Sequence, residues 1–340
     1  MSDPIVIWGA GAIGGTLGAA WVRAGHDVLF VDNVPEHVEA MRNRGLEIEG
    51  PLEAFKTAPL KAALPADVSG QFRRIVLAVK AHHTDGAMRV LAPHLAADGF
   101  VLSAQNGLNE LVIARHVGES RTMGCFVNYG ADYLAPGRLL RGNRGAVVVG
   151  EIDGEVRSRT REMFALLQVF EPDAVLTKNI WGYLWGKLGY GALLFATALT
   201  DASIADALAS PRHFTLWRQL GAEVMAVAAA KRVACEGFNG FDPAAFMPGA
   251  DPAATQRAID IMVGFNRGSA KSHSGVWRDL AVRKRRTEVD AQIAIIAEIG
   301  REIGVEAPLV RKLVALIHDV EENRRPQSWD TLDALATETK

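Results

Sequence analysis

The sequence predicts an α/β domain followed by an all-helical domain, and three observations support this fold class. A buried strand, a glycine loop, a helix and a second strand follow one another within the first 32 residues. Strand-like and helix-like runs then alternate up to about residue 150, as in a parallel sheet covered on both faces. Beyond about residue 155 the strand-like runs stop, and long apolar-periodic segments typical of helices take their place.

The first βαβ unit has the clearest pattern. Residues 4–8 (PIVIW) form an apolar run typical of a buried strand, and residues 26–32 (HDVLFVD) form a second one. Between them, residues 16–25 read as a helix that ends at Gly25. GAGAIGG occupies residues 9–15, between the first strand and the helix. This order is typical of a Rossmann dinucleotide-binding domain.

The remaining elements follow from periodicity. In the N-terminal half we expect helices at 34–45, 85–95 and 106–117, strands at 74–79, 100–104, 122–129 and 146–150, and a turn at 136–138. In the C-terminal half we expect helices at 157–168, 179–199, 213–234, 254–265, 276–303 and 308–322.

Composition shifts divide the chain into domains. We expect residues 236–253, rich in glycine and proline, to form an ordered loop or lid, and the polar tail beyond Pro326 to fray. We therefore place an NAD(P)-binding domain at 1–175, a helical substrate and catalytic domain at 176–330, and a tail at 331–340.

Composition also restricts the class of protein. The 340 residues correspond to about two domains. With 37 Lys and Arg against 39 Asp and Glu, the net charge of −2 argues against nucleic acid and anionic membranes as partners. We find no signal peptide and no membrane span. The two cysteines, Cys125 and Cys235, give no disulfide framework and fit a reducing cytoplasm.

The glycine loop has the spacing GxGxxG. The first glycine permits a tight turn, the second lets the backbone approach a pyrophosphate, and the third lets the helix pack against the sheet. Free N–H groups at the helix N-terminus favour phosphate charge. The alternative is a plain strand-to-helix turn. We assign the whole loop to cofactor binding: Gly9, Ala10, Gly11, Ala12, Ile13 and Gly14.

Asp32 ends the second strand, 21 positions after Gly11. An acid at this distance accepts hydrogen bonds from the adenosine ribose hydroxyls and repels a 2′-phosphate. Residues 33–36 are NVPE, so no Arg or Lys follows directly. The sequence therefore favours NAD over NADP, although a solvated acid at a strand end would look the same.

Five further motifs occur in order along the chain: AVKAHHT at 78–84, QNG at 105–107, GEIDG at 150–154, WGKL at 185–188 and RDLAVRKRRTEVDA at 278–291. Together with the glycine loop they resemble the ketopantoate reductase (2-dehydropantoate 2-reductase) family over most of the chain. The resemblance implies a Rossmann domain joined to a helical domain, with the active site in the cleft between them. It also implies a nicotinamide cofactor and reduction of a 2-keto acid to a 2-hydroxy acid in pantothenate biosynthesis.

The resemblance implies Lys187 as the general acid. Hydride arrival at a ketone carbon builds negative charge on its oxygen, which must be hydrogen-bonded and protonated. A lysine with the ordinary pKa of about 10.4 is protonated at pH 7. The alternative is a surface lysine on an apolar helix. Its apolar neighbours argue against this: Trp181, Leu184, Trp185, Leu188 and Tyr190.

Other residues match family positions. Glu288 would hydrogen-bond the cofactor ribose or the substrate and hold the lysine charge; alternatively it pairs with Lys284 one helical turn earlier. Asn106 would orient the substrate, cofactor or lysine, unless it only forms an Asn-Gly turn. Lys80 follows a strand that ends at the cofactor crevice, or is simply solvated. Ser272 and Ser274 lie where the family carries substrate-contacting serines, but the local sequence differs.

Two positions depart from the family pattern. Asp32 replaces the usual Arg or Lys that grips the 2′-phosphate of NADP, and Gly191 replaces an asparagine four residues beyond Lys187. The resulting pocket should suit a bulkier, more apolar keto acid than ketopantoate. An NAD-dependent D-2-hydroxy-acid dehydrogenase is therefore the alternative within the enzyme class. A non-catalytic cofactor-sensing protein is disfavoured because Lys187 and Glu288 are both present.

Other signals give no further site. His82 and His83 lack the spacing and the carboxylate of a metal site, so no metal is expected. The basic run RKRR at 283–286 lies in a predicted helix among acidic residues, and reads as a solvated or cleft-lining face. We expect a small-molecule 2-keto acid as the partner, and the apolar helical domain permits a homodimer.

Overall fold

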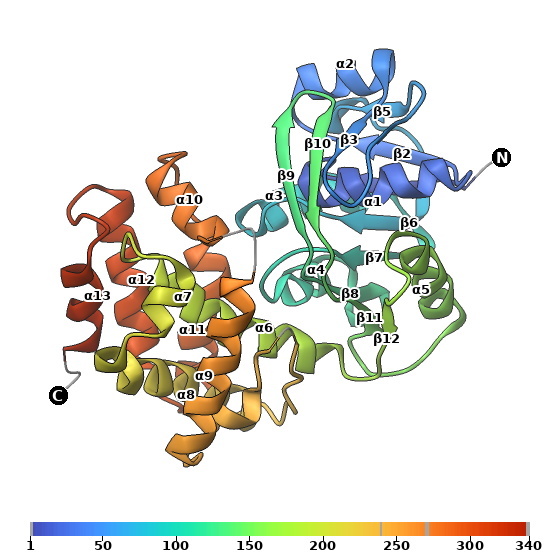
Figure 1. The fold of residues 1–340 in the computed structure, drawn as a ribbon. Helices are drawn as coiled ribbons and strands as arrows, with labels where there is room; N and C mark the ends of the chain where they lie inside the picture. The colour runs from blue at the N-terminus through green and yellow to red at the C-terminus, as the bar shows by residue number, and fades with distance from the viewer. Residues whose placement is uncertain (1–2, 239, 269–271, 338–340) are drawn as a thin grey trace. The chain divides into compact units, whose positions relative to one another are not determined.

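The computed structural model describes residues 3–238, 240–268 and 272–337. It consists of two compact units, which divide between Ile180 and Trp181 at the start of helix α6 (Ile180–Thr197) (Figure 1). The predicted fold class is confirmed: the first unit is a mixed α/β unit and the second is helical. The expected boundary at residues 175 and 176 falls inside strand β12, which belongs to the sheet of the first unit.

The first unit is built on an eight-stranded sheet of order β12-β11-β8-β7-β6-β1-β2-β5. Neighbouring strands run parallel except β8 and β11. The strands are β1 (Ile5–Trp8), β2 (Val28–Val31), β5 (Lys61–Ala63), β6 (Phe72–Leu77), β7 (Leu95–Ser103), β8 (Thr122–Val127), β11 (Val147–Glu151) and β12 (Val175–Leu176). The helices are α1 (Ala12–Arg23), α2 (Pro35–Arg44), α3 (Thr84–Leu91), α4 (Asn109–Val117) and α5 (Ser158–Phe170), with short 3-10 turns at η1 (Pro65–Asp67), η2 (Ala81–His83), η3 (Ala92–His94) and η4 (Glu119–Arg121).

A second, four-stranded sheet of order β4-β3-β10-β9 was not predicted. Its strands are β3 (Glu47–Glu49), β4 (Phe55–Lys56), β9 (Gly130–Ala135) and β10 (Arg138–Asn143). Two of them have only two or three residues, too few for an alternating pattern to stand out. The turn expected at 136–138 is confirmed, because it joins β9 to β10 with Gly137 at φ +80°.

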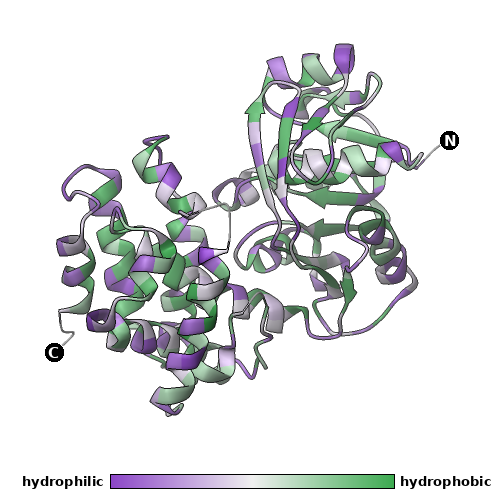
Figure 2. Cartoon of the chain, in the orientation of Figure 1, coloured by the Kyte–Doolittle hydropathy of each residue, from purple (hydrophilic) through white to green (hydrophobic). Residues whose placement is uncertain are grey.

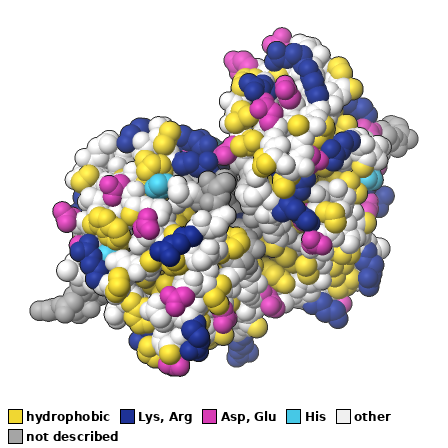
Figure 3. All heavy atoms as spheres, in the orientation of Figure 1, with side chains coloured by type: hydrophobic (Ala, Val, Ile, Leu, Met, Phe, Trp, Pro, Cys, Tyr) yellow, Lys and Arg dark blue, Asp and Glu magenta, His cyan; other side chains and the backbone are white. Residues whose placement is uncertain are grey.

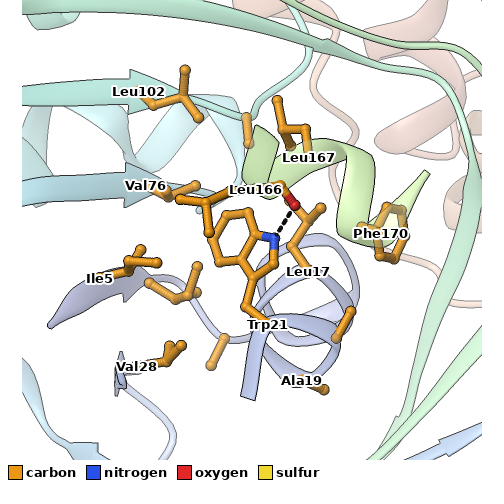
Figure 4. Packing of buried hydrophobic residues seen from close by; sticks show 14 of the residues in the cluster. Ile5, Leu17, Ala19, Trp21, Val28, Val76, Leu102, Leu166, Leu167 and Phe170 are labelled. Carbon is orange, nitrogen blue, oxygen red and sulfur yellow. Dashed lines mark hydrogen bonds between the residues drawn. The ribbon is translucent and has the colours of Figure 1, made fainter. Parts of the chain in front are cut away.

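The core of the first unit joins the large sheet to α1 and α5 (Figure 4). Trp21 is fully buried there, and its indole N–H donates to the Leu166 carbonyl oxygen at 2.6 Å. Helix α1 also lies close to β2, since a Cβ on Gly18 would collide with the ring of Phe30. The strands of the large sheet are predominantly hydrophobic (Figure 2), as expected for a sheet covered on both faces. Replacing Trp21 with alanine would cost about 3–5 kcal/mol of stability.

The second unit contains eight α-helices within its described residues: α6, α7 (Ile204–Leu208), α8 (Phe214–Ala230), α9 (Pro252–Arg267), α10 (Gly275–Ala281), α11 (Ile295–Glu302), α12 (Pro308–Glu321) and α13 (Trp329–Ala336). Short 3-10 turns lie at η5 (Pro211–His213) and η6 (Pro243–Phe246). None of the helices described is long and apolar enough to cross a membrane. Basic and acidic side chains are interspersed over the face shown in Figure 3.

The long helix expected at 276–303 is wrong. Helix α10 ends at Ala281, an irregular stretch follows, and a π-helical segment η7 (Asp290–Ala294) leads into α11. Lys284 has a φ of +49°, and Asp279 accepts hydrogen bonds from the side chains of Arg283 and Arg285. The basic run therefore leaves the helix and folds back on a buried carboxylate, so Lys284 cannot be the helical i−4 partner of Glu288.

The fraying expected beyond Pro326 is also wrong for the residues described, which end at 337. Ser328 caps α13 by accepting the Thr331 N–H, and Leu332 and Leu335 are fully buried. In a helix of only about two turns, the polar residues mask the apolar spacing. Segment 236–253, apart from residue 239 outside the described residues, contains η6 and the stacked rings of Phe241 and Phe246. The described part of this loop is therefore packed.

Candidate active site

The glycine loop lies between β1 and α1 in the first unit. Gly9 has a φ of +99°, and a Cβ there would lie 2.7 Å from the Val79 nitrogen. A Cβ on Gly14 would collide with the Gly9 carbonyl oxygen. Gly11 is different, because a Cβ there would project into open space with no atom within 4 Å. The first and third glycines are required by the protein itself, whereas the open side of Gly11 leaves room for a ligand.

The loop can receive a phosphate at α1. Gly11 is the N-cap residue and has no side chain to satisfy the first helical amides. Ala12 and Ile13 begin the helix directly after it, so their amides lie in the positively polarised first turn. The loop from Gly9 to Gly14 thus combines a first glycine at positive φ with a helix N-terminus that has no side-chain cap.

The loops after β6 and β7 meet the glycine loop at the carboxyl edge of the sheet. The Gln105 side-chain amide donates to the Val79 carbonyl oxygen at 2.8 Å, and Val79 lies against Gly9. Lys80 and Asn106, the predicted site residues of these loops, are both exposed next to these contacts. The structure thus brings three predicted segments of the first unit together where ligands of parallel sheets bind. The sequence analysis assigned no role to Gln105, yet its side chain joins the loop after β7 to the loop after β6.

Asp32 follows β2 and is fixed by two backbone amides. Its Oδ2 accepts the Ala10 N–H at 2.8 Å, and its Oδ1 accepts the Val34 N–H at 3.0 Å. Each oxygen retains a second acceptor site. The carboxylate is therefore oriented beside the glycine loop with spare capacity for two hydroxyl donors.

His37 and Tyr133 were missed by the sequence analysis. The fully buried His37 accepts the Gly137 N–H at Nδ1, so Nε2 carries the proton and donates to the Ala10 carbonyl oxygen, both at 2.9 Å. Tyr133 of β9 packs edge-on against its ring at 5.0 Å. Burial and the nearby negative charges of Asp32 and Glu36 raise the pKa of Tyr133. A single buried histidine near the start of a helix produces no periodic pattern. Its partner Gly137 lies in the turn between β9 and β10, so the contact could not be predicted without the small sheet.

Glu110 is another missed residue, on α4 directly behind the Asn106 loop. Its side chain is fully buried. Burial raises its pKa to about 8, although backbone hydrogen bonding and the Ser103 hydroxyl partly oppose the shift. The group is therefore largely protonated at neutral pH, which lowers the cost of burying it. A glutamate in the first turn of a helix is ordinarily interpreted as a favourable dipole contact, so the burial of Glu110 could not be predicted from the sequence.

Lys187 and Gly191 lie one helical turn apart in the middle of α6, both half-buried. A Cβ on Gly191 would meet no atom within 4 Å, whereas one on Gly189 would lie 2.7 Å from the Met225 side chain. Open space is therefore available next to Lys187. Tyr190 lies beside them, and the Asn266 amide donates to its hydroxyl at 3.3 Å.

Glu288 is buried in the same unit, at the end of the irregular stretch and just before η7. The preceding Thr287 donates through both its N–H and its hydroxyl to Glu321 Oε1, at 2.6 and 2.7 Å. The predicted residues Lys187 and Glu288 thus belong to one unit, whereas the glycine loop, Asp32, Lys80 and Asn106 belong to the other.

Ser274 is the N-cap of α10 and accepts the Trp277 N–H at 3.1 Å. Ser272 hydrogen-bonds His273 Nδ1 at 2.8 Å. The buried Ser274 hydroxyl therefore has a capping role that needs no substrate. Among the described residues, no three His, Cys, Asp or Glu side chains gather as a metal site would require.

Comparison with known proteins decides the family. The profile of the family described as Ketopantoate reductase PanE/ApbA matches residues 5–154, and the profile of its C-terminal part matches residues 179–321. The chain belongs to the ketopantoate reductase family. The predicted resemblance is thereby confirmed, and the protein is an oxidoreductase of that family.

Individual members of the ketopantoate reductase family align over nearly the full chain. A 2-dehydropantoate 2-reductase from Archaeoglobus fulgidus is 29% identical over 322 residues, covering 93% of this chain and 97% of the relative. A ketopantoate reductase structure from Ralstonia eutropha JMP134 superposes with a TM-score of 0.78 at 25% identity, covering 94% and 99%. D-mandelate dehydrogenase with NADH and anilino(oxo)acetate superposes with a TM-score of 0.80 at 21% identity, with the same coverage, and shares the fold.

Proposed function

We propose that the protein reduces a 2-keto acid to a 2-hydroxy acid with a nicotinamide cofactor, and that 2-dehydropantoate is the first substrate to consider. The observation that carries the proposal is the match of both units to one family, which includes the glycine loop in one unit and Lys187 with Glu288 in the other. Relatives named 2-dehydropantoate 2-reductase align over 92–93% of the chain.

The chain's own residues suit this chemistry. A nicotinamide, when bound, supplies the hydride. The amides of Gly11, Ala12 and Ile13 would bind the pyrophosphate, and Lys80 and Asn106 would line the cofactor crevice. Lys187 would hydrogen-bond the ketone oxygen and deliver a proton as charge develops there. Glu288 would orient the bound molecule and balance the lysine charge.

We further propose that NAD is the preferred cofactor. Both oxygens of Asp32 are held by backbone amides, so the carboxylate cannot easily turn away from a ribose. A 2′-phosphate would meet this negative charge and that of Glu36 in the next helix. Ribose hydroxyls, in contrast, can donate to the remaining acceptor sites of Asp32.

A bulkier keto acid is the second candidate substrate, as in an NAD-dependent D-2-hydroxy-acid dehydrogenase. The open space at Gly191, one turn from Lys187, is the observation that favours it. A polar side chain at this position would fill that space and add hydrogen bonds. Without one, the extra hydroxyl of ketopantoate loses a partner.

Initial rates with NADH and NADPH against ketopantoate, phenylglyoxylate and 4-methyl-2-oxopentanoate test these proposals. Turnover of either bulky acid with NADH would support Asp32 as the residue that favours NAD and Gly191 as the residue that makes room for a bulkier substrate. NADPH with ketopantoate would contradict both while preserving the 2-keto acid reaction, and no turnover with any pair would contradict the reaction itself. Gly191→Asn should shift preference toward ketopantoate, whereas Gly264→Asn, at another open helical glycine, should not.

A further inference from the structure

The segment that carries Glu288 is held by side chains rather than by regular secondary structure. It lies between the end of α10 at Ala281 and the start of η7 at Asp290. Glu321 of α12 accepts both hydrogen bonds that Thr287 donates, at 2.6 and 2.7 Å. The Thr287 hydroxyl in turn accepts the Val289 N–H at 3.2 Å. The Glu321 carboxylate therefore holds Thr287, the residue before Glu288, and the Thr287 hydroxyl holds the amide of Val289, the residue after it.

The Glu321 carboxylate is itself held by a histidine. Its side chain is only 3% exposed, and its second oxygen lies 2.8 Å from His318 Nδ1. A carboxylate removed from water in this way is costly unless a cation or several donors compensate it. Thr287 supplies two donors, and His318 supplies the third.

His318 lies between two carboxylates. Nδ1 faces Glu321 Oε2 at 2.8 Å, and Nε2 faces Asp290 Oδ1 at 2.9 Å. Carboxylates only accept, so both contacts are hydrogen bonds only when both ring nitrogens carry a proton. The geometry thus calls for an imidazolium. Asp290 opens η7, so this ring connects α12 to both ends of the Glu288 segment.

The charges around His318 favour its protonated form. Burial lowers the pKa of His318, but the hydrogen bonds and charges of Glu321 and Asp290 outweigh this and raise it. His318 and Asp290 line a hollow that also contains charged residues of α12, of the irregular stretch before η7 and of the loop after α12: Arg286, Asp319, Glu322 and Arg324. These pair with one another, Arg324 with Asp319 at 2.6 Å and Arg286 with Glu322 at 3.9 Å.

We propose that His318 is a positioning residue for Glu288: as an imidazolium it fixes Glu321, and Glu321 holds the backbone at Thr287. The inference rests on the proposed function, because the role of Glu288 does. Loss of one ring proton must break one of the two hydrogen bonds and leave Glu321 without its cation. The clamp formed by His318, Glu321 and Thr287 is therefore complete at low pH and is lost as the pH rises through the raised pKa of His318.

Three variants test the clamp. His318→Gln is neutral at every pH, His318→Lys keeps a cation, and His116→Gln is the matched control. His116 also contacts an aspartate, Asp85, at 2.9 Å, and its side chain is 21% exposed against 25% for His318, but it lies in the first unit. The measurements are kcat/KM and amide hydrogen exchange of residues 284–290, both between about pH 5 and 9, where histidine titrates.

We expect wild-type kcat/KM to fall about tenfold as His318 loses its proton, less than the roughly hundredfold that an ångström of misplacement can cost. Exchange at the Thr287 amide should rise over the same range. His318→Gln should show the low kcat/KM and the fast Thr287 exchange at every pH. His318→Lys should keep the high kcat/KM and the slow exchange to higher pH than wild type. His116→Gln should show the wild-type profile.

An unchanged profile in His318→Gln, or a change in thermal stability alone, would overturn the proposal. So would a His318→Lys variant that keeps the wild-type alkaline step. If no 2-keto acid is turned over, the proposed function fails separately. The exchange measurement then decides on the clamp, which is refuted if Thr287 exchange is the same in wild type and His318→Gln.

Discussion

The glycine loop and the Glu288 segment are held in place by different means. The loop is shaped by backbone geometry: Gly9 and Gly14 leave no room for a Cβ, and the strand and helix on either side are regular. The Glu288 segment is irregular and depends on the carboxylate of Glu321. The loop should therefore be sensitive to one added carbon and indifferent to pH. The segment should tolerate changes of volume and respond to changes of charge.

The largest expected effect is at Lys187, on the helical side of the comparison. Lys187→Ala should lower kcat by about 10²- to 10⁴-fold, because in the proposed reaction the ketone oxygen loses its proton donor. Initial rates with saturating cofactor and keto acid measure this. Lys231→Ala, at the end of α8, is the control and should leave kcat unchanged. A wild-type kcat in Lys187→Ala would contradict the role of Lys187 as the proton donor.

Glu110 limits the contrast between the two regions, because it should make the stability of the first unit depend on pH as well. Its pKa rises from 4.5 in the unfolded chain to about 8 in the folded protein. The folded state therefore holds a proton that the unfolded state has lost, and stability falls as pH rises between these values. The fall should reach roughly 4 kcal/mol by pH 8.

Urea unfolding of Glu110→Gln across this pH range tests the effect. The variant should lack the decline, whereas Glu119→Gln, at an exposed glutamate, should retain it. Equal slopes in Glu110→Gln and wild type would show that the buried carboxyl does not titrate as inferred.

A pair of glycine variants sharpens the comparison within the loop. Gly14→Ala should lower the free energy of unfolding by about 1–3 kcal/mol, because its Cβ meets the Gly9 carbonyl oxygen. Gly11→Ala should change stability by no more than about 0.5 kcal/mol, yet weaken NADH binding about tenfold. Chemical denaturation and NADH fluorescence titration separate the two. Equal NADH affinity in Gly11→Ala and wild type would exclude a cofactor at this face.

The smallest expected effect concerns two helix caps. Ser274 and Ser328 both accept a backbone N–H, so each alanine variant should lose about 1 kcal/mol of stability. If Ser274 also contacts the substrate, as proposed from its position in the sequence, only Ser274→Ala should raise the KM for the keto acid. Unchanged KM in both variants would leave Ser274 with its capping role alone.

The glycine loop could be predicted from the sequence, whereas the Glu288 segment could not. The βαβ unit, the glycine loop and Asp32 lie within the first 32 residues, where their spacing and the apolar runs form one recognisable pattern. The irregular stretch after Ala281 is held partly by Glu321, which bonds Thr287 from 34 residues away, and α13, which carries the buried Leu332, packs against α8 and α12. Apolar periodicity ran through the break because Val289, Ile293 and Ile296 continue the spacing on its far side.

The contact of His37 with Ala10 and Gly137 ties the conformation of the glycine loop to the length of a remote turn. One inserted residue between β9 and β10 would move the Gly137 amide away from His37 Nδ1, and free the ring to change tautomer or tilt. The Ala10 carbonyl oxygen would then lose its donor at the start of the glycine loop. Natural variation in this hairpin should therefore avoid changes of length even where its exposed side chains vary freely.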